Sequence, residues 1–440
     1  MKAAEATSST ATNMGRLKYY QVSVFVCGWI SYASTYCLRK PLGVIKADLH
    51  KFMNLSTTQL GWLDTALLLP YAIMQMILGP IGDRYGARKT FGVCIILSAL
   101  SMITFGYFSS FTIWFILLFL NGTAQSQCWP NVTKGVLGWF SDSVRNSMFG
   151  MFGTCAFAGG IIGTMIAVYI QANYGWRQVY FFPAVGMIFL GLGTLIFFQQ
   201  PDEVGIQVPG KESVESTPKG SAVAGGEKPK MWDLWNMPMI PEVSVAVFCL
   251  KVVRYCMYMW LPMYLLQALN YSSAMAGVFS TVFEIGGVTG SALIGFALDR
   301  YYKGQTLRGI AFFVLLSTVG LVLFMLTSSW GVFFNSLFMF MAGAFNAGPD
   351  ILLCGTVPAE LVEKHNKNAA TATIGLVNGF GSIGTCIEGP IIGAITAYAG
   401  WTGMFYLMIG LSALGTLSTY KAESIFRRVN RPTTDFIAGV

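Results

Sequence analysis

The chain has 440 residues, of which 54% are hydrophobic and 11% charged, and its formal net charge is +8. Soluble domains usually contain about 25% charged residues, so this composition excludes an ordinary soluble enzyme and indicates a polytopic membrane protein. The positive charge does not indicate a nucleic-acid binder, because the basic residues fall on alternate loops, as orientation signals do.

Twelve apolar runs are each long enough to cross a bilayer, which takes about 20 residues per helix. They form two sets of six, near residues 20–45, 58–82, 89–108, 111–138, 145–172 and 177–198, and then 241–267, 273–299, 308–327, 331–357, 367–397 and 401–423. The predicted fold class is therefore an all-α membrane protein with twelve transmembrane helices in two six-helix halves.

These runs divide the chain into a tail (1–17), a six-helix bundle (18–200), a linker (201–238), a second bundle (239–424) and a C-terminal tail (425–440). The linker is rich in Gly, Ser, Pro and charge, so we expect it to be disordered. Basic residues concentrate in one set of alternate loops, which predicts cytoplasmic tails and a cytoplasmic linker. Lys46 and Lys51 lie on the other side and are exceptions.

The first run contains Arg39, and the seventh contains Arg254 at the corresponding place in the second half. A guanidinium at bilayer depth costs at least about 2.5 to 3.5 kcal/mol, so it is usually retained where it faces protein or water and meets a negative group. The pair predicts an anion-binding site. The alternative is two buried structural ion pairs, with Asp64 and Glu284 as candidate partners.

The second run of each half contains a matched set of residues. Gly61 and Gly277 match, as do Asp83 and Asp299, because 277 − 61 and 299 − 83 both equal 216. The dipeptide that begins at Gly175 recurs at residues 400–401. Parallel repeats of this kind place a transport site at the interface between the halves, near the membrane midplane.

Other polar residues in the runs allow alternatives. Lys40 follows Arg39 and on a helix would point about 100° away, so Arg39 is the predicted ligand group. Asp64 could pair with either residue or carry a proton, while Glu388 and Asp350 receive no role. Aromatic side chains in membrane spans mostly pack or anchor interfaces, but several could line the cavity: Tyr32, Tyr36, Tyr255, Tyr258 and Trp129.

Residues 79–89 read GPIGDRYGARK, and a shortened copy begins at residue 295. This pattern resembles the loop 2-3 signature of the major facilitator superfamily, and the resemblance implies its pseudo-symmetric fold. The glycines permit close helix packing, and Asp83 can accept hydrogen bonds from basic groups or a helix terminus, which would form a cytoplasmic latch. Gating or structural charges are predicted at Asp83, Arg84, Arg88, Asp299, Arg300, Asp64 and Glu284.

Within that superfamily, residues 28–40, 122–134, 251–264 and 368–390 resemble the organophosphate:phosphate antiporters, and more closely the sugar-phosphate exchangers of eukaryotic endomembranes. The resemblance implies that two arginines hold the substrate phosphate. A guanidinium suits this role because its planar fork of donors matches phosphate oxygens. The predicted substrate-binding residues are Arg39, Arg254, Lys251, Tyr36, Tyr255, Trp129 and Gln125.

The chain departs from the bacterial glycerol-3-phosphate carriers at two contacts. They have a lysine where this chain has Gln75 and a histidine where it has Ala156 or Phe157. The bacterial substrate preference is therefore not carried over. Lys251, one helical turn before Arg254, could supply the extra positive charge, or it could form a salt bridge with Glu284.

The implied function is the exchange of a phosphorylated sugar or other organophosphate, such as glucose 6-phosphate or glycerol 3-phosphate, for inorganic phosphate by alternating access. The resemblance favours the endoplasmic reticulum membrane. A proton-coupled symporter of organic anions, with Asp64 or Glu284 titrating, is the alternative. No catalytic motif, metal-ligand spacing or phosphate-binding loop is present, so no enzymatic activity, cofactor or metal is expected. Membrane lipid is an expected partner, nucleic acid is not, and a monomer is sufficient.

Overall fold

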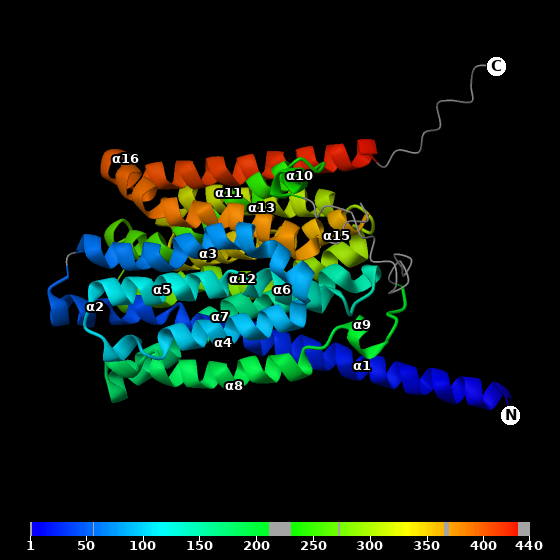
Figure 1. Cartoon of the computed structure of the whole chain (residues 1–440). Helices are drawn as coiled ribbons and strands as arrows, with labels where there is room; N and C mark the ends of the chain where they lie inside the picture. Colours follow the sequence, from blue (N-terminus) through cyan, green and yellow to red (C-terminus); the bar gives the residue numbers. More distant parts are fainter. Residues whose placement is uncertain (1, 56, 211–229, 272, 365–368, 430–440) are drawn as a thin grey trace, which may run out of the picture.

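A computed structural model of the chain describes residues 2–55, 57–210, 230–271, 273–364 and 369–429. All regular secondary structure in these residues is helical. Figure 1 shows the long helices side by side, with the start of α1 (Lys2–Thr35) and the end of α16 (Ala370–Val429) at the same end of the bundle. We call this the tail end and the opposite end the far end.

The first half contains α1, α2 (Pro41–Met53), α3 (Thr57–Tyr85), α4 (Ala87–Met102), α5 (Phe111–Gln125), α6 (Cys128–Leu137), α7 (Arg145–Tyr174) and α8 (Phe181–Phe197). The second contains α11 (Ile240–Gln267), α12 (Ser273–Tyr301), α13 (Thr306–Leu326), α14 (Val332–Leu353), α15 (Thr356–Lys364) and α16. Two short helices separate the halves in the chain, α9 (Pro201–Val204) and α10 (Met231–Trp235), and α10 packs against α11 and α16.

Ten segments of the described residues are long and apolar enough to cross a membrane. The two predicted runs without such a segment are interrupted. In the run 20–45, the apolar part of α1 extends only from Tyr19 to Thr35. The run 111–138 is divided near Ser126 into α5, with 15 residues, and α6, with 10 residues. The apolar part of α1, α5 and α6 are therefore each shorter than the roughly 20 residues that a crossing requires.

The internal repeat of the sequence is also a repeat of structure. Helix α12 begins and ends at the positions that correspond to the two ends of α3, since 273 − 57 and 301 − 85 both equal 216. Helix α7 matches the part of α16 before Gly400, since 370 − 145 and 399 − 174 both equal 225. The halves meet where α3 packs along α16 and where α7 packs along α12.

Two matching glycines end the fifth and eleventh spans. Gly175 follows α7 with φ 82° and ψ 160°, and Gly400 interrupts α16 with φ 64° and ψ −167°. Residues other than glycine rarely adopt this extended conformation at positive φ. Helix α16 therefore consists of two spans joined at Gly400, as the separate runs 367–397 and 401–423 predict.

The ends of the predicted domains differ from the helix ends. Helix α1 begins at Lys2, so the segment predicted as an N-terminal tail is helical. Helix α16 continues to Val429, beyond the predicted end of the second bundle at residue 424. Within the linker expected to be disordered, Pro201–Val204 form α9, and residues 211–229 lie outside the described part of the chain.

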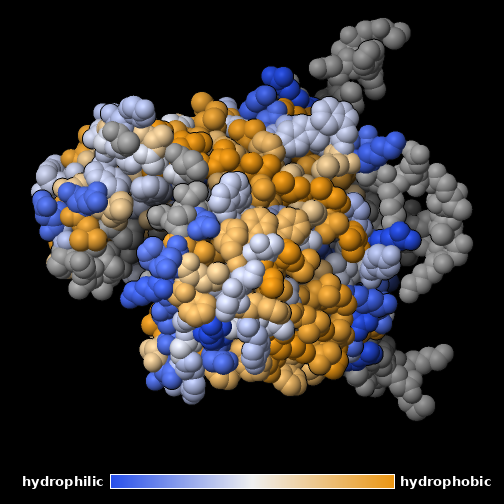
Figure 2. Space-filling view, turned by 60° about the vertical axis from the view of Figure 1, so that its left-hand side comes forward, coloured by the Kyte–Doolittle hydropathy of each residue, from blue (hydrophilic) through white to orange (hydrophobic). Residues whose placement is uncertain are grey.

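The outer surface is suited to lipid. Figure 2 shows hydrophobic residues across the middle of one face and hydrophilic residues gathered toward its edges. Large apolar side chains are highly exposed on helices of both halves, including Phe189, Leu293 and Leu417. Soluble monomers rarely expose so much contiguous apolar surface. The protein is a multi-pass integral membrane protein.

Candidate functional site

Arg39 lies at a break in the first span. Helix α1 ends at Thr35, the 3-10 turn η1 (Tyr36–Leu38) follows, and α2 begins with Pro41. Proline suits the first position of a helix, and it disfavours the continuation of an earlier helix because it lacks an N–H and its ring crowds the preceding turn. Arg39 and Lys40 lie in the turn between these helices, but both keep right-handed helical dihedrals, so the expected difference in their directions still holds.

The guanidinium of Arg39 is held by a neutral amide. Its Nε donates a hydrogen bond to Oε1 of Gln125. The amide nitrogen of Gln125 in turn donates to Ser98 Oγ at 3.0 Å and to Asn121 Oδ1 at 2.9 Å. This buried network fixes the orientation of Gln125, and Gln125 fixes Arg39.

Three tyrosine rings surround the same guanidinium. Its central carbon lies 4.3 Å from the ring centre of Tyr71, 5.1 Å from that of Tyr36 and 6.0 Å from that of Tyr32, all within cation–π range. The Nη2 atom of Arg39 is buried and has no hydrogen-bond partner in the described part of the chain. An unsatisfied buried donor is costly, so this atom is poised to meet an acceptor from a ligand.

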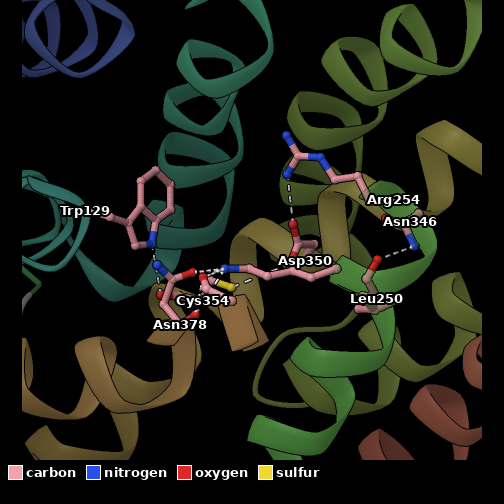
Figure 3. Close-up of polar contacts among 9 residues, drawn as sticks. Trp129, Leu250, Arg254, Asn346, Asp350, Cys354 and Asn378 are labelled. Carbon is pink, nitrogen blue, oxygen red and sulfur yellow. Dashed lines mark hydrogen bonds and ion pairs between the residues drawn. The ribbon is translucent and has the colours of Figure 1, made fainter. Parts of the chain in front are cut away.

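Arg254 has a different environment. Its Nη1 donates to Oδ2 of Asp350 at 2.9 Å, and the Asp350 side chain is 2% exposed (Figure 3). Its guanidinium also lies 4.1 Å from the ring centre of Phe157, which belongs to α7 in the other half. Arg254 therefore forms a buried ion pair, as the alternative reading of the sequence predicted, but its partner is Asp350 on α14 and not Glu284.

Lys251 has neutral partners. Its Nζ donates to Oδ1 of Asn378, to the Asn378 carbonyl oxygen at 3.2 Å and to Ser382 Oγ at 3.0 Å. The suggested salt bridge from Lys251 to Glu284 is absent among the described residues. Asn378 also donates to Gln75 Oε1 at 2.8 Å, which links the halves, and the Gln75 amide nitrogen is buried without a partner within the described ranges.

The two arginines face a common region. Tyr36 of the first half interacts electrostatically with both Arg39 and Arg254, and so does Tyr255 of the second half. Two tyrosines therefore lie within electrostatic range of both guanidinium groups.

The remaining intramembrane charges form further pairs. Lys40 and Glu284 interact electrostatically across the halves, and Asp64 forms an ion pair with Lys46 of α2. The suggestion that Asp64 is the partner of Arg39 is therefore wrong.

We call the charged residues around the two arginines the central cluster. Its cations are Arg39, Lys40, Lys251 and Arg254, and its carboxylates are Asp350 and Glu284. Four positive and two negative charges leave a net charge of +2.

Trp129 is a contact between the halves in this conformation. Its ring centre lies 4.9 Å from that of Tyr32, and its indole nitrogen donates to the carbonyl oxygen of Cys354 at 3.2 Å. The side chain is almost fully buried. A contact with substrate stays a prediction for this residue.

Asp83 connects the end of α3 to the start of α16 at the tail end. Its carboxylate accepts hydrogen bonds from the backbone nitrogens of Thr371 at 3.2 Å and Ala372 at 3.0 Å. It also accepts one from Lys134 Nζ at 2.7 Å. A carboxylate at a helix N-terminus is stabilised by unpaired N–H groups and by the helix dipole.

Asp299 makes the matching connection between α12 and the start of α7. It accepts hydrogen bonds from the Ser147 backbone nitrogen at 2.6 Å and from Asn146 Nδ2 at 2.9 Å. Arg145 of the first half pairs nearby with Glu363 of the second at 2.7 Å. We call the hydrogen bonds of Asp83 and Asp299 between the halves the tail-end latches.

The other basic residues of the repeated motif lie outside these latches. Arg88 donates to the carboxylate of Glu203 in α9 and to the carbonyl oxygen of Leu195 at the end of α8. Arg84 and Arg300 are exposed. Arg88 therefore ties the first half to the linker, and no latch contact supports a gating role for Arg84 or Arg300 in this conformation.

Sequence reasoning missed two residues of the site and left a third without a role. Tyr71 contacts Arg39, Asn378 contacts Lys251, and Asp350 pairs with Arg254. A polar residue inside an apolar run was an available signal for Asn378 and Asp350. Tyr71 had no such signal, because a packing tyrosine looks the same in sequence.

The model of the Major Facilitator Superfamily matches residues 24–372. The chain belongs to this superfamily. It is 27% identical to the putative glycerol-3-phosphate transporter 5 of Arabidopsis thaliana, over 89% of this chain and 88% of that protein. It is also 27% identical to sugar phosphate exchanger 3 of Homo sapiens, over 90% and 91% of the two chains. A solved proton:xylose symporter shares the fold, with a TM-score of 0.69 and 14% identity over 94% and 96% of the chains.

Proposed function

We propose that the protein exchanges an organophosphate, such as glucose 6-phosphate or glycerol 3-phosphate, for inorganic phosphate. The main observation is that Arg39 and Arg254, one from each half, share tyrosine neighbours, while Nη2 of Arg39 has no protein partner among the described residues. A guanidinium can bind two phosphate oxygens through parallel donors. The names of the glycerol-3-phosphate transporter and sugar phosphate exchanger relatives support the same substrate class.

The charge of the central cluster suits such substrates. Its surplus of two positive charges is close to the charge of a phosphate monoester, which is about −1.5 to −2 at neutral pH. Inorganic phosphate has a similar charge. Either substrate would nearly neutralise the site, and exchange of one for the other would move little net charge across the membrane.

Alternating access gives the tail-end latches a role. Opening of the tail end must break the hydrogen bonds of Asp83 and Asp299, which join each half to a helix of the other. An anion that contacts both arginines draws the halves together at the site and lowers the barrier for this change. An empty carrier lacks that bridge, so exchange is favoured over leak.

The tail end is cytoplasmic in this proposal, because the basic loops gather there. The endoplasmic reticulum membrane is the proposed location. One chain is sufficient, since the site lies between the two halves of a single chain. Membrane lipid is the other partner, and the transport cycle needs no cofactor, metal or nucleic acid.

Uptake into reconstituted vesicles tests this function. Vesicles preloaded with inorganic phosphate are challenged with glucose 6-phosphate, glycerol 3-phosphate, phosphoenolpyruvate and unphosphorylated glucose. We expect glucose 6-phosphate and glycerol 3-phosphate to enter only when phosphate is inside, and glucose to stay out. Uptake that is indifferent to internal phosphate would overturn the exchange mechanism.

The alternative is proton-coupled symport of organic anions, with Asp64 or Glu284 as the titrating group. Each of these carboxylates has a lysine neighbour, Lys46 and Lys40 respectively. Symport should follow an imposed proton gradient and should be lost in Asp64→Asn. Exchange should instead follow the phosphate gradient and survive that substitution.

Tyr71→Leu should weaken phosphate binding, because the tyrosine ring stacks on the guanidinium of Arg39 at 4.3 Å. A cation–π contact contributes about 0.5 to 2 kcal/mol, so the phosphate concentration for half-maximal inhibition of uptake should rise about two- to thirtyfold. Tyr406→Leu removes a tyrosine that is 63% exposed on the outer surface and should leave this value unchanged. Equal inhibition curves for wild type and Tyr71→Leu would refute the role of the ring.

A further inference from the structure

The two arginines of the central cluster differ in their partners. Arg39 is held by the neutral side chain of Gln125 and by tyrosine rings. Arg254 instead donates to the carboxylate of Asp350 (Figure 3). One arginine therefore keeps its full charge for a ligand, whereas the charge of the other is already balanced by the protein.

Asp350 is a fixed part of the site. Its side chain is 2% exposed, one oxygen accepts from Arg254 at 2.9 Å, and the other accepts from Cys354 Sγ at 3.6 Å. Asp350 and Arg254 both belong to the second half, on α14 and α11. Movement of the halves relative to each other therefore does not require this ion pair to break.

We propose that Asp350 sets the charge of the solute that the carrier accepts. With Asp350 the central cluster has a surplus of two positive charges, and without it the surplus would be three. This inference rests on the proposed function and narrows its substrate class. The carrier accepts phosphate esters of neutral alcohols and sugars, and it rejects phosphate esters that also carry a carboxylate.

Electrostatics gives the reason. A sugar phosphate carries about two negative charges at neutral pH, and phosphoenolpyruvate carries about one more because of its carboxylate. The additional charge would remain unbalanced next to Asp350 in a site shielded from water. One unit charge at a few ångströms and intermediate dielectric changes binding by about tenfold or more.

Lys251 provides a second test of the charge count, because its replacement removes a positive charge whereas replacement of Asp350 removes a negative one. It contributes one of the surplus charges and has only neutral partners, Asn378 and Ser382, in the part of the chain that the structure describes. Its replacement by glutamine lowers the surplus to one positive charge. The carrier should then discriminate even more strongly against the solute of higher charge.

The experiment compares initial uptake of glucose 6-phosphate and phosphoenolpyruvate into phosphate-loaded vesicles. We expect wild type to prefer glucose 6-phosphate, Asp350→Asn to shift the ratio about tenfold or more toward phosphoenolpyruvate, and Lys251→Gln to shift it the other way. Glu423→Gln is the matched control. Glu423 is a buried carboxylate that pairs with Arg427 outside the central cluster, so its replacement should leave the ratio unchanged.

The outcomes separate this inference from the proposed function. If wild type takes up neither phosphate ester in exchange for phosphate, the proposed function fails. If wild type exchanges but Asp350→Asn keeps the wild-type ratio, the inference is overturned and the function stands. Should Asp350→Asn not reach the membrane, an unchanged ratio in Lys251→Gln would overturn the inference equally.

Discussion

Arg39→Lys should abolish exchange while the protein still reaches the membrane. Lysine keeps the charge, but its compact ammonium lacks the planar fork with which Arg39 binds Gln125 through Nε and presents Nη2 to phosphate oxygens. Loss of a buried charge-assisted contact costs about 2 to 5 kcal/mol, so we expect counterflow to fall by about thirtyfold or more. Arg254→Lys should have the same effect. Counterflow per amount of reconstituted protein is the measurement.

Arg177→Lys is the matched control for this loss. Arg177 also lies over aromatic rings, at 4.6 Å from the ring centres of both Phe52 and Trp176, but it is outside the central cluster. This variant should exchange at nearly the wild-type rate. Transport retained in Arg39→Lys would count heavily against a phosphate site built on two guanidinium groups.

The sequence predicted the parts of the fold that depend on length and repetition. Twelve apolar runs, the constant offset between the second spans of the halves and the recurrence of Gly175 as Gly400 are properties of the chain itself. The structure confirms the all-α class and the repeated spans. That Arg39 needs a function or a partner was also predictable, since a charge in an apolar run is costly.

The partners of the charged residues could not be predicted. A span that is apolar on all sides has no amphipathic period, so its sequence does not reveal which helix each face contacts. Glu284 and Asp350 were both acids in apolar runs, and only tertiary packing shows that Asp350 reaches Arg254. The break at Pro41, which moves Arg39 from a helix into a turn, had a local signal in the proline itself.

The tail-end latches obey the same symmetry as the spans. Asp299 corresponds to Asp83, since 299 − 83 equals 216, and Ala372 corresponds to Ser147, since 372 − 147 equals 225. In both cases the carboxylate at the end of the second span of one half accepts a hydrogen bond from a backbone nitrogen at the start of the fifth span of the other half. Closure at this end is therefore made twice, by two equivalent interfaces.

Each interface requires a close approach of two backbones. A Cβ at Gly79 of α3 would lie 2.7 Å from the Cα of Ala372 in α16, and a Cβ at Gly295 of α12 would collide with the carbonyl oxygen of Asn146 near the start of α7. The two glycines are matching residues, because 295 − 79 equals 216. No side chain larger than hydrogen fits at either position while the tail end is closed.

Gly79→Leu should therefore prevent closure of the tail end and stall the carrier. Overpacking costs about 1 to 3 kcal/mol, so exchange should fall on the order of ten- to a hundredfold, with a smaller loss in Gly79→Ala. Gly186→Leu is the control, since a Cβ at Gly186 meets nothing within 4 Å.

Thiol labelling measures closure of the tail end directly. A cysteine introduced by Thr371→Cys lies behind the latch, and it should react faster with an impermeant thiol reagent in the Gly79→Leu background than in the wild-type background. Slow labelling together with normal exchange would show that the carrier does not need this interface to close.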